Sequence, residues 1–167
     1  MESLTDTPAS PPFRASAAAQ PPALFHAHVT VLVRLAVLML GDQAAAQDVV
    51  REALFGLRRR WDVPGGQDRA VADARASVLD GCRDALRRRP PHLLPGVPLS
   101  AEHRAVLTAL HRLPGRQREA VVLRHCLGLP EDEAAEAMGV SRETVRSATH
   151  CGLAALAGLR QETRPRQ

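Results

Sequence analysis

The chain of 167 residues contains no lysine and no tyrosine, and its aromatic side chains are limited to three phenylalanines and one tryptophan. All 22 basic residues are therefore arginine. Strands favour aromatic and β-branched residues, whereas alanine, leucine and arginine dominate here. The hydrophobic share of 45% is large enough for a packed core. These features predict an all-α fold.

Long apolar runs and paired cysteines are also missing. The longest strongly apolar run, residues 35–40, is far too short to span a membrane, and no N-terminal stretch has the pattern of a secretory signal. The three cysteines, Cys82, Cys126 and Cys151, are odd in number and show no CxxC spacing. Such cysteines are typical of reduced thiols. We expect a cytoplasmic protein without a membrane partner.

The sequence lacks the short motifs that mark common enzyme classes. There is no GxxxxGK, GxSxG or HExxH pattern, so nothing in the sequence favours an enzyme. Two His-Cys pairs, at 125–126 and 150–151, lie on different predicted helices without close-ligand spacing, and we expect no metal and no cofactor. The formal charge of +4 suits an anionic partner.

Prolines divide the chain into segments. Five of the 13 prolines lie in residues 1–22 and four lie in residues 90–98. Proline cannot continue a helix, and clusters of it are typical of leaders and linkers. We predict a disordered leader, two helical domains, a Pro-rich linker between them and a basic tail. Their bounds are 1–22 for the leader, 23–89 and 100–160 for the domains, 90–99 for the linker and 161–167 for the tail.

The first domain has the periodicity of three amphipathic helices. Gly41 is expected to end the first helix and Asp42 to cap the second. A third helix is expected over about 69–89, with Val78 and Cys82 buried. Three such helices in fewer than 70 residues predict a small bundle.

The second domain begins at Ser100, a plausible N-cap. An apolar stripe follows at helical spacing and is expected to face the core. Its members are Val106, Leu107, Leu110 and Leu113. A further helix is expected over about 116–127, ended by Gly128.

The next stretch has the features of a helix-turn-helix. Pro130 suits a helix start, and the acidic residues 131–133 complement the positive end of the helix dipole. Gly139 can adopt the left-handed conformation of a tight turn, and Ser141 can cap the following helix. In this arrangement the second helix enters a DNA major groove.

The charge distribution supports DNA binding by the second helix of this motif. Residues 142–167 contain five arginines and two acids, whereas residues 101–141 contain five arginines and six acids. Val145, Leu153 and Leu156 are expected to pack inward. Candidate contacts to bases or phosphates on the outer face are Arg142, Glu143, Thr144, Arg146, Ser147, Thr149 and His150. The alternative is an ordinary helical hairpin with a solvated charged face.

Both domains resemble a bacterial RNA polymerase sigma factor of the extracytoplasmic-function class, within the sigma-70 family. The stretch 113–124, reading LPGRQREAVVLR, and the helix-turn-helix of 133–147 resemble region 4 of that family. In the first domain, LGD at 40–42, DVVREA at 48–53 and RRRW at 58–61 are similar to region 2. The resemblance implies a region 2-like three-helix bundle joined to a region 4-like helix-turn-helix domain.

The resemblance also implies partners and a mechanism. A sigma factor binds core RNA polymerase and directs promoter-specific transcription initiation, often under the control of an anti-sigma factor. Asp48, Arg51 and Glu52 would bind polymerase, while region 4 would bind the polymerase flap and the upstream promoter element. The loop 62–69 would capture a flipped base. Arginines of the following helix would hold the downstream element, namely Arg75, Arg83, Arg87 and Arg88.

Several positions depart from the family pattern. Arg51 stands where Gln is common, and Asp73 stands where an aromatic residue commonly opens the third-helix motif. Asp73 and Asp80 would share one helix face and repel DNA phosphate, and Gly81 weakens the helix. These departures leave open a degenerate sigma-like regulator that binds polymerase or DNA without opening promoters. A helix-turn-helix repressor acting alone is a third hypothesis.

Overall fold

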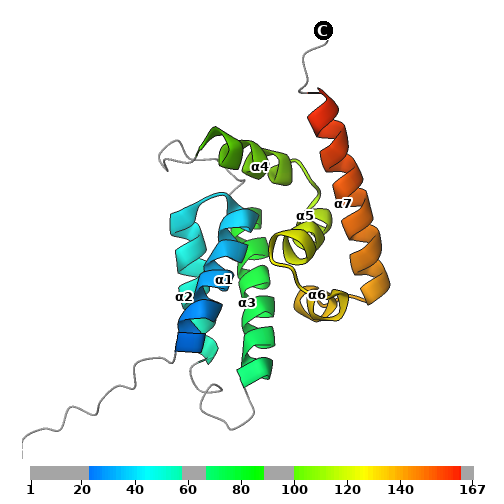
Figure 1. Ribbon diagram of the computed structural model, residues 1–167. Coiled ribbons are helices and arrows are strands. Elements are labelled where there is room, and N and C mark those ends of the chain that lie inside the picture. The colour runs from blue at the N-terminus through cyan, green and yellow to red at the C-terminus, as the bar shows by residue number, and fades with distance from the viewer. Residues whose placement is uncertain (1–22, 58–66, 89–99, 163–167) are drawn as a thin grey trace, which may run out of the picture.

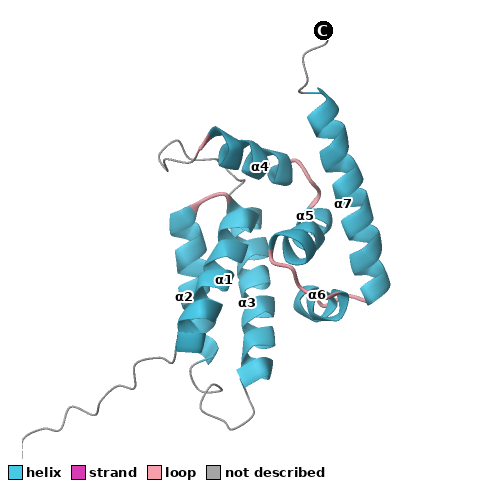
Figure 2. Ribbon diagram, viewed as in Figure 1, coloured by secondary structure: helices cyan, strands magenta, loops and turns pink. Residues whose placement is uncertain are grey.

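The computed structural model describes residues 23–57, 67–88 and 100–162. Every secondary-structure element within these ranges is a helix (Figure 2), which confirms the all-α prediction. The predicted leader, most of the loop 62–69, the linker and nearly all of the tail lie outside the described residues, as do the basic run 58–60 and Trp61. In the described ranges, no helix is both long enough and apolar enough to cross a membrane.

The first three helices form a bundle (Figure 1). They are α1 (Ala23–Leu40), α2 (Gln43–Leu57) and α3 (Gln67–Arg88). Gly41 has a φ of 70°, the left-handed conformation that ends α1. The Asp42 carboxylate then accepts a hydrogen bond from the Ala44 backbone N–H at 2.9 Å. Both predicted signals are confirmed, because each depends on chemistry within a few residues.

The bundle core is made of side chains that are fully buried, among them Leu35, Met39, Val78 and Cys82. Gly81 has a packing role that its helix propensity does not reveal. A Cβ atom placed on Gly81 would lie 2.7 Å from Cγ1 of Val49. The glycine therefore lets α2 approach α3 closely.

The remaining elements belong to the second half of the chain. They are α4 (Ala101–His111), α5 (Gly115–Val121), the π-helical segment η1 (Val122–Cys126), α6 (Glu131–Met138) and α7 (Arg142–Glu162). Ser100 caps α4 by accepting the His103 N–H, as predicted. The helix expected over 116–127 is divided, because its second part widens to the π-helical pattern, in which the Leu127 N–H donates to the Val122 carbonyl.

Two predicted core residues are not buried. Val106 is 52% exposed and Leu153 is 39% exposed, so the prediction of their burial is wrong. Both line a groove between α4 and α7. Apolar periodicity identifies the face of a helix that avoids water, but it does not tell whether another element of the same chain covers that face.

The two halves pack against each other. Helix α3 lies beside α6, and α1 contacts both α4 and η1 (Figure 1). The buried apolar residues of both halves form one continuous cluster. Arg118 links the halves, because its buried guanidinium donates to the carbonyls of Leu110 and Leu113 and, across the interface, to that of Met39 at 3.3 Å.

Candidate nucleic-acid interface

The turn between α6 and α7 has the backbone geometry of a helix-turn-helix. Gly139 adopts the left-handed conformation, with φ 66° and ψ 37°. The Val140 N–H donates to the Ala135 carbonyl at 3.1 Å, which satisfies one of the last carbonyls of α6. The Ser141 hydroxyl oxygen accepts the Thr144 N–H at 3.2 Å and caps α7. The local sequence signals thus set the angle between the helices.

Small and apolar side chains hold this angle. Ala134, Ala135 and Ala137 are buried on α6 together with Met138. Val145 of α7 is fully buried against them, as predicted. Short alanine side chains allow close approach of the two helices, so the N-terminal half of α7 is held in a defined orientation.

The residues predicted to bind the upstream element lie on α7 and include its N-terminal turn. Arg142, Glu143, Arg146, Ser147 and His150 are exposed, whereas Thr144 and Thr149 are half-buried. The Thr149 hydroxyl donates to the Val145 carbonyl at 2.7 Å, and the Thr144 hydroxyl lies 2.9 Å from that of Ser141. Five of the seven side chains are therefore accessible, and both threonines make local hydrogen bonds.

Arg146 is already oriented by two carboxylates. Its guanidinium lies 3.0 Å from Glu131 of α6 and 3.2 Å from Glu143 one turn earlier on α7. The hydrogen bond from Arg146 lowers the pKa of Glu131 and raises that of Arg146. A DNA phosphate or base would compete with these carboxylates for the guanidinium.

The arginines predicted to hold the downstream element lie in two different environments. Arg75 and Arg83 of α3 face the second half of the chain, where Arg75 lies 2.5 Å from Glu133 of α6. Arg87 is exposed and pairs with Asp84 of the same helix, and Arg88 is exposed. Arg75 and Arg83 are therefore covered by the second half of the chain, whereas Arg87 and Arg88 are accessible to a ligand.

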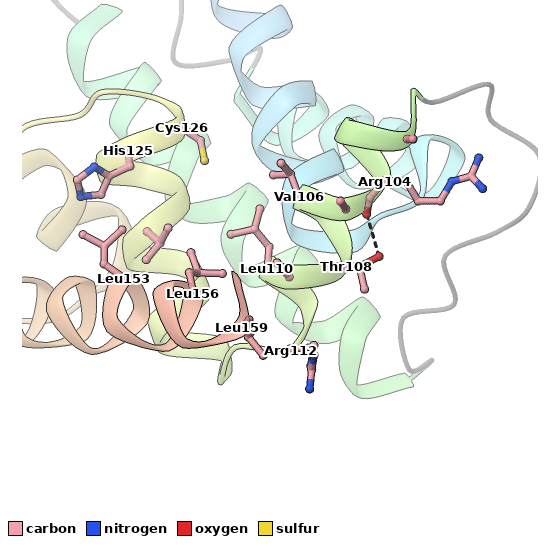
Figure 3. Close-up of a pocket in the computed structure, with 14 residues that line it drawn as sticks. Arg104, Val106, Thr108, Leu110, Arg112, His125, Cys126, Leu153, Leu156 and Leu159 are labelled. Atoms are coloured by element: carbon pink, nitrogen blue, oxygen red, sulfur yellow. Dashed lines mark hydrogen bonds between the residues drawn. The ribbon is translucent and has the colours of Figure 1, made fainter. Parts of the chain in front are cut away.

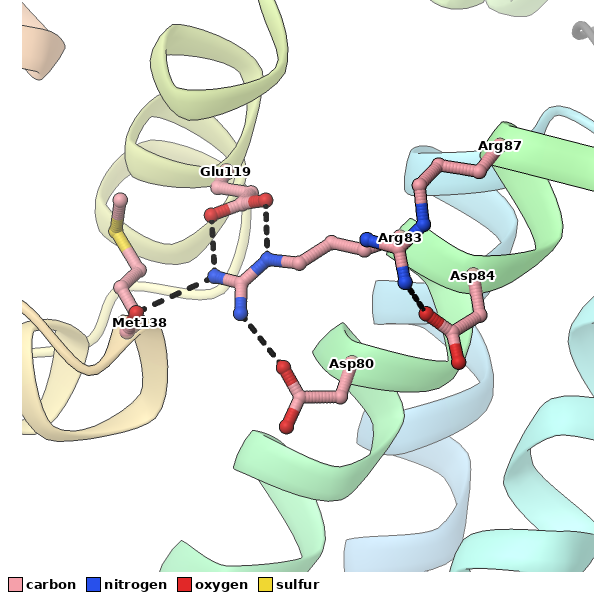
Figure 4. Close-up of polar contacts among 6 residues, drawn as sticks. All are labelled: Asp80, Arg83, Asp84, Arg87, Glu119 and Met138. Atoms are coloured by element: carbon pink, nitrogen blue, oxygen red, sulfur yellow. Dashed lines mark hydrogen bonds and ion pairs between the residues drawn. The ribbon is translucent and has the colours of Figure 1, made fainter.

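Arg83 is the centre of a polar cluster between the halves (Figure 4). Its Nε and Nη2 donate to the two Glu119 oxygens at 2.8 and 2.7 Å, and its Nη1 donates to Asp80 at 2.7 Å. The side chain of Glu119 is only 5% exposed. These hydrogen bonds raise the pKa of Arg83, and burial raises the pKa of the neighbouring Cys82 thiol to about 12. Cys82 is thus an unreactive core residue.

Sequence reasoning missed the buried charges Arg118 and Glu119. Both fall in the region 4-like stretch 113–124, for which the sequence alone predicts no buried charge. Glu119 pairs with the distant Arg83, and Arg118 donates to the distant Met39 carbonyl as well as to nearby carbonyls such as that of Leu113. An isolated charge is too costly to bury, but no local signal identifies which distant group pairs with it.

The residues predicted to bind polymerase lie on α2. Asp48, Arg51 and Glu52 are all exposed, and Asp48 and Arg51 form an ion pair at 2.8 Å. Glu52 also lines a groove of about 390 Å³ between α2 and α3, together with Asp80 and Asp84. This surface is acidic and accessible to a protein partner.

An apolar groove of about 880 Å³ lies between α4, η1 and α7 (Figure 3). The side chains of Val106, Leu110, Cys126, Leu153 and Leu156 line it. Burial raises the pKa of Cys126 above its ordinary value. An exposed apolar groove between two helices suits the apolar face of a helix from another protein.

Metal binding finds no support in the described part of the chain, where no three His, Cys, Asp or Glu side chains gather to hold an ion. The cysteines of the two His-Cys pairs also differ in accessibility, since Cys126 is half-buried and Cys151 is exposed.

Comparison with known proteins places the chain in a family. The model of sigma-70 region 4 matches residues 103–156, which include α5, α6 and the helix-turn-helix. The RNA polymerase sigma-E factor of Streptomyces avermitilis is 33% identical over 148 residues, which cover 81% of this chain and 80% of the relative. The sigma-E factor of Streptomyces coelicolor is 33% identical over 144 residues, which cover 78% of each chain.

Two solved structures share the fold. CnrH, solved in complex with the cytosolic domain of CnrY, superposes with a TM-score of 0.70 at 24% identity and covers 84% of this chain and 87% of its own. The sigma factor RpoE of Bartonella quintana, solved with the anti-sigma factor NepR, gives a TM-score of 0.62 at 19% identity and covers 84% of this chain and 96% of its own.

The fold and the helix-turn-helix define a two-domain, all-helical protein of the sigma-70 class. Together with the similarity along most of its length, they show that the chain belongs to the extracytoplasmic-function sigma factors of bacterial RNA polymerase.

Proposed function

We propose that this chain binds core RNA polymerase in the cytoplasm and directs it to specific promoters, without catalytic chemistry of its own. The observation that carries the proposal is the α6–α7 unit. Its turn is fixed by Gly139 and Ser141, and its second helix presents Arg142, Arg146 and His150 outward. These side chains can donate to phosphates and to guanine edges in a major groove.

Polymerase binding is assigned to two surfaces. The first is the α2 surface with Asp48, Arg51 and Glu52, which is exposed and charged. The second is the apolar groove between α4 and α7, which could receive a helix of the polymerase flap. Named relatives are sigma factors, and solved neighbours are complexes with CnrY and with the anti-sigma factor NepR. We therefore also propose an anti-sigma partner for this chain.

The test is co-elution of the purified protein with bacterial core RNA polymerase. Asp48→Arg and Glu52→Arg are expected to reduce binding at least tenfold, because each places a cation on the docking surface. Both side chains are exposed, and Asp48, which pairs with the 74% exposed Arg51, is itself 72% exposed, so neither change should unfold the bundle. Asp132→Arg, an equal charge reversal on α6, is the matched control and should bind like the native protein. Failure of the native protein to bind would refute the proposal.

The second candidate is a sigma-like regulator that does not open promoters. The observation that favours it is the pair of carboxylates on α3. Asp80 is 71% exposed, and Asp73 lies 3.1 Å from Arg69 on the same helix. Carboxylates at these positions weaken the attraction of α3 for a melted strand. Gly81 no longer supports this candidate, since its contact with Val49 gives it a packing role.

A further inference from the structure

Two exposed arginines in the first half of α7 differ in their contacts. The Arg146 guanidinium donates through Nη2 to Glu131 of α6 at 3.0 Å and through Nη1 to Glu143 of α7 at 3.2 Å. The Arg142 side chain, one turn earlier, makes no hydrogen bond or ion pair with any described residue. Both guanidinium groups are accessible to DNA, but only that of Arg146 is already bound by carboxylates.

Glu131 connects Arg146 to the first helix of the helix-turn-helix. Its side chain is 32% exposed, against 61% for Arg146 and 78% for Glu143. The hydrogen bond from Arg146, together with the charges of Arg124 and Arg142, lowers the pKa of Glu131, so this carboxylate is ionised at neutral pH. Because buried alanines hold α6 close to α7, the same packing that sets the angle of the motif also places Glu131 beside Arg146.

The two carboxylates change which ligand the guanidinium favours. Two carboxylates and one guanidinium give this group a net charge of −1. A phosphate that competes for Arg146 is repelled by both carboxylates, whereas a guanine edge is neutral and offers the acceptors O6 and N7. A guanidinium has five N–H groups, and the two carboxylates take two of them, so three remain for a base.

Arg146 lies on the face of α7 that is directed away from the core. Glu143, Arg146 and His150 follow the spacing i, i+3, i+7 and are all exposed, so they share one outer face. Val145 and Gly152 are buried on the opposite side. In a helix-turn-helix, the N-terminal residues of the second helix are the ones that contact base edges. The position of Arg146 therefore suits a base contact.

We propose that Glu131 and Glu143 position Arg146 to read a guanine of the upstream element, while Arg142 binds a phosphate. Arg146 is the specificity-determining residue, and Glu131 is a positioning residue. The inference rests on the proposed function for the identity of the DNA and adds the base that is read. Because Glu131 belongs to α6, the first helix of the motif contributes to specificity through Arg146 without contacting a base itself.

The test compares specific with non-specific binding by the complex of the full chain and core RNA polymerase. The complex first selects duplex fragments from genomic DNA, and the upstream segment that these fragments share is then randomised one position at a time. Affinities are measured at one salt concentration for the selected duplex and for a duplex with this segment scrambled. The native complex should prefer guanine at one or more positions of the segment.

Arg146→Gln and Arg142→Gln form a matched pair, because each removes one exposed guanidinium from α7. Arg146→Gln should weaken binding to the selected duplex about tenfold or more, change binding to the scrambled duplex less than about twofold, and abolish the guanine preference at one position. Arg142→Gln should weaken binding to both duplexes by the same factor and keep every base preference. It should also lower the slope of log affinity against log salt by about one.

Glu131→Gln and Asp132→Asn test the positioning role. Each removes one negative charge from the first turn of α6, but of these two carboxylates only Glu131 pairs with Arg146 in the described part of the chain. Glu131→Gln should free Arg146 to bind phosphates, so the ratio of specific to non-specific affinity should fall about threefold to fivefold. Asp132→Asn should change this ratio less than about twofold. A merely structural role of Glu131 would lower both affinities together and leave the ratio unchanged.

The outcomes separate the inference from the proposed function. A uniform loss of affinity in Arg146→Gln, with every base preference kept, would overturn the inference. Equal effects of Glu131→Gln and Asp132→Asn on the affinity ratio would overturn it as well. Both results leave polymerase binding and promoter selection intact. If the native chain forms no complex with core polymerase, or if the complex selects no sequence, the proposed function fails and the inference fails with it.

Discussion

Gly152 sits where α7 crosses α5, and its substitution tests how tightly these helices pack. The residue is buried in the middle of α7. A Cβ atom at this position would lie 2.7 Å from Cγ2 of Val121 and 3.2 Å from the Gln117 carbonyl oxygen. Val121 is 3% exposed and the carbonyl belongs to the backbone of α5, so neither atom can move without shifting the helix.

Two opposing effects decide the stability of Gly152→Ala. Alanine gains about 1 kcal/mol over glycine inside a helix. Insertion of a methyl group into a closely packed contact costs about 1–3 kcal/mol, and the contact here lies at the severe end. The net loss should be about 1–2 kcal/mol, which corresponds to a fall in Tm of about 2–8 °C at 2–4 °C per kcal/mol.

Gly158→Ala on the same helix provides the control. No atom lies within 4 Å of its added Cβ, so only the helix propensity changes. This variant should gain about 0.5–1 kcal/mol, and thermal unfolding followed by circular dichroism measures both. If Gly152→Ala is as stable as Gly158→Ala, then α5 and α7 are not as close as described, and the orientation of the DNA-reading helix is not fixed by this contact.

Three further predictions concern the cap, a buried histidine and the apolar groove. Ser141→Ala removes the acceptor of the Thr144 N–H and should cost about 1 kcal/mol in urea denaturation, with restoration by Ser141→Asp. Burial and the charge of Arg118 lower the pKa of His111 to about 4. The unfolded chain therefore takes up a proton that the native state refuses. The free energy of unfolding should fall by about 1–2 kcal/mol as the pH falls from 7 to 4, and stay flat above about pH 7.5, where both states have lost the proton. A pH titration of stability that shows no difference between the native protein and His111→Gln would contradict this assignment. Leu153→Asp should leave Tm within about 2 °C, because Leu153 is 39% exposed. The same change should weaken binding to core polymerase at least fivefold in a pull-down. Undiminished binding would show that the groove is not part of the polymerase interface.

Features that depend on neighbouring residues could be predicted from the sequence. Gly41 and Gly139 both adopt the left-handed conformation, and Ser100 and Ser141 both cap helices. In each case the partner lies within four residues, so the chemistry is visible in the sequence itself. The helix-turn-helix could be predicted from the sequence for the same reason.

Features that depend on contacts between distant segments could not be predicted. The sequence marks Arg83 as a cation on a helix, but its pairing with Glu119 depends on how the two halves pack. Val106 lies on an apolar stripe, yet the groove beside it is left open. From the sequence, Gly81 is expected only to weaken α3, whereas in the structure it makes room for the Val49 side chain of α2.

Run-off transcription is the measurement that shows whether this protein directs promoter-specific initiation, as proposed. Core RNA polymerase and the purified protein are combined with duplex promoter fragments that the protein itself selects from genomic DNA. A sigma factor should give a discrete transcript that requires the protein and disappears when the selected promoter is scrambled. Formation of the polymerase complex and specific DNA binding without any transcript from duplex templates would contradict the proposal and favour the regulator that does not open promoters.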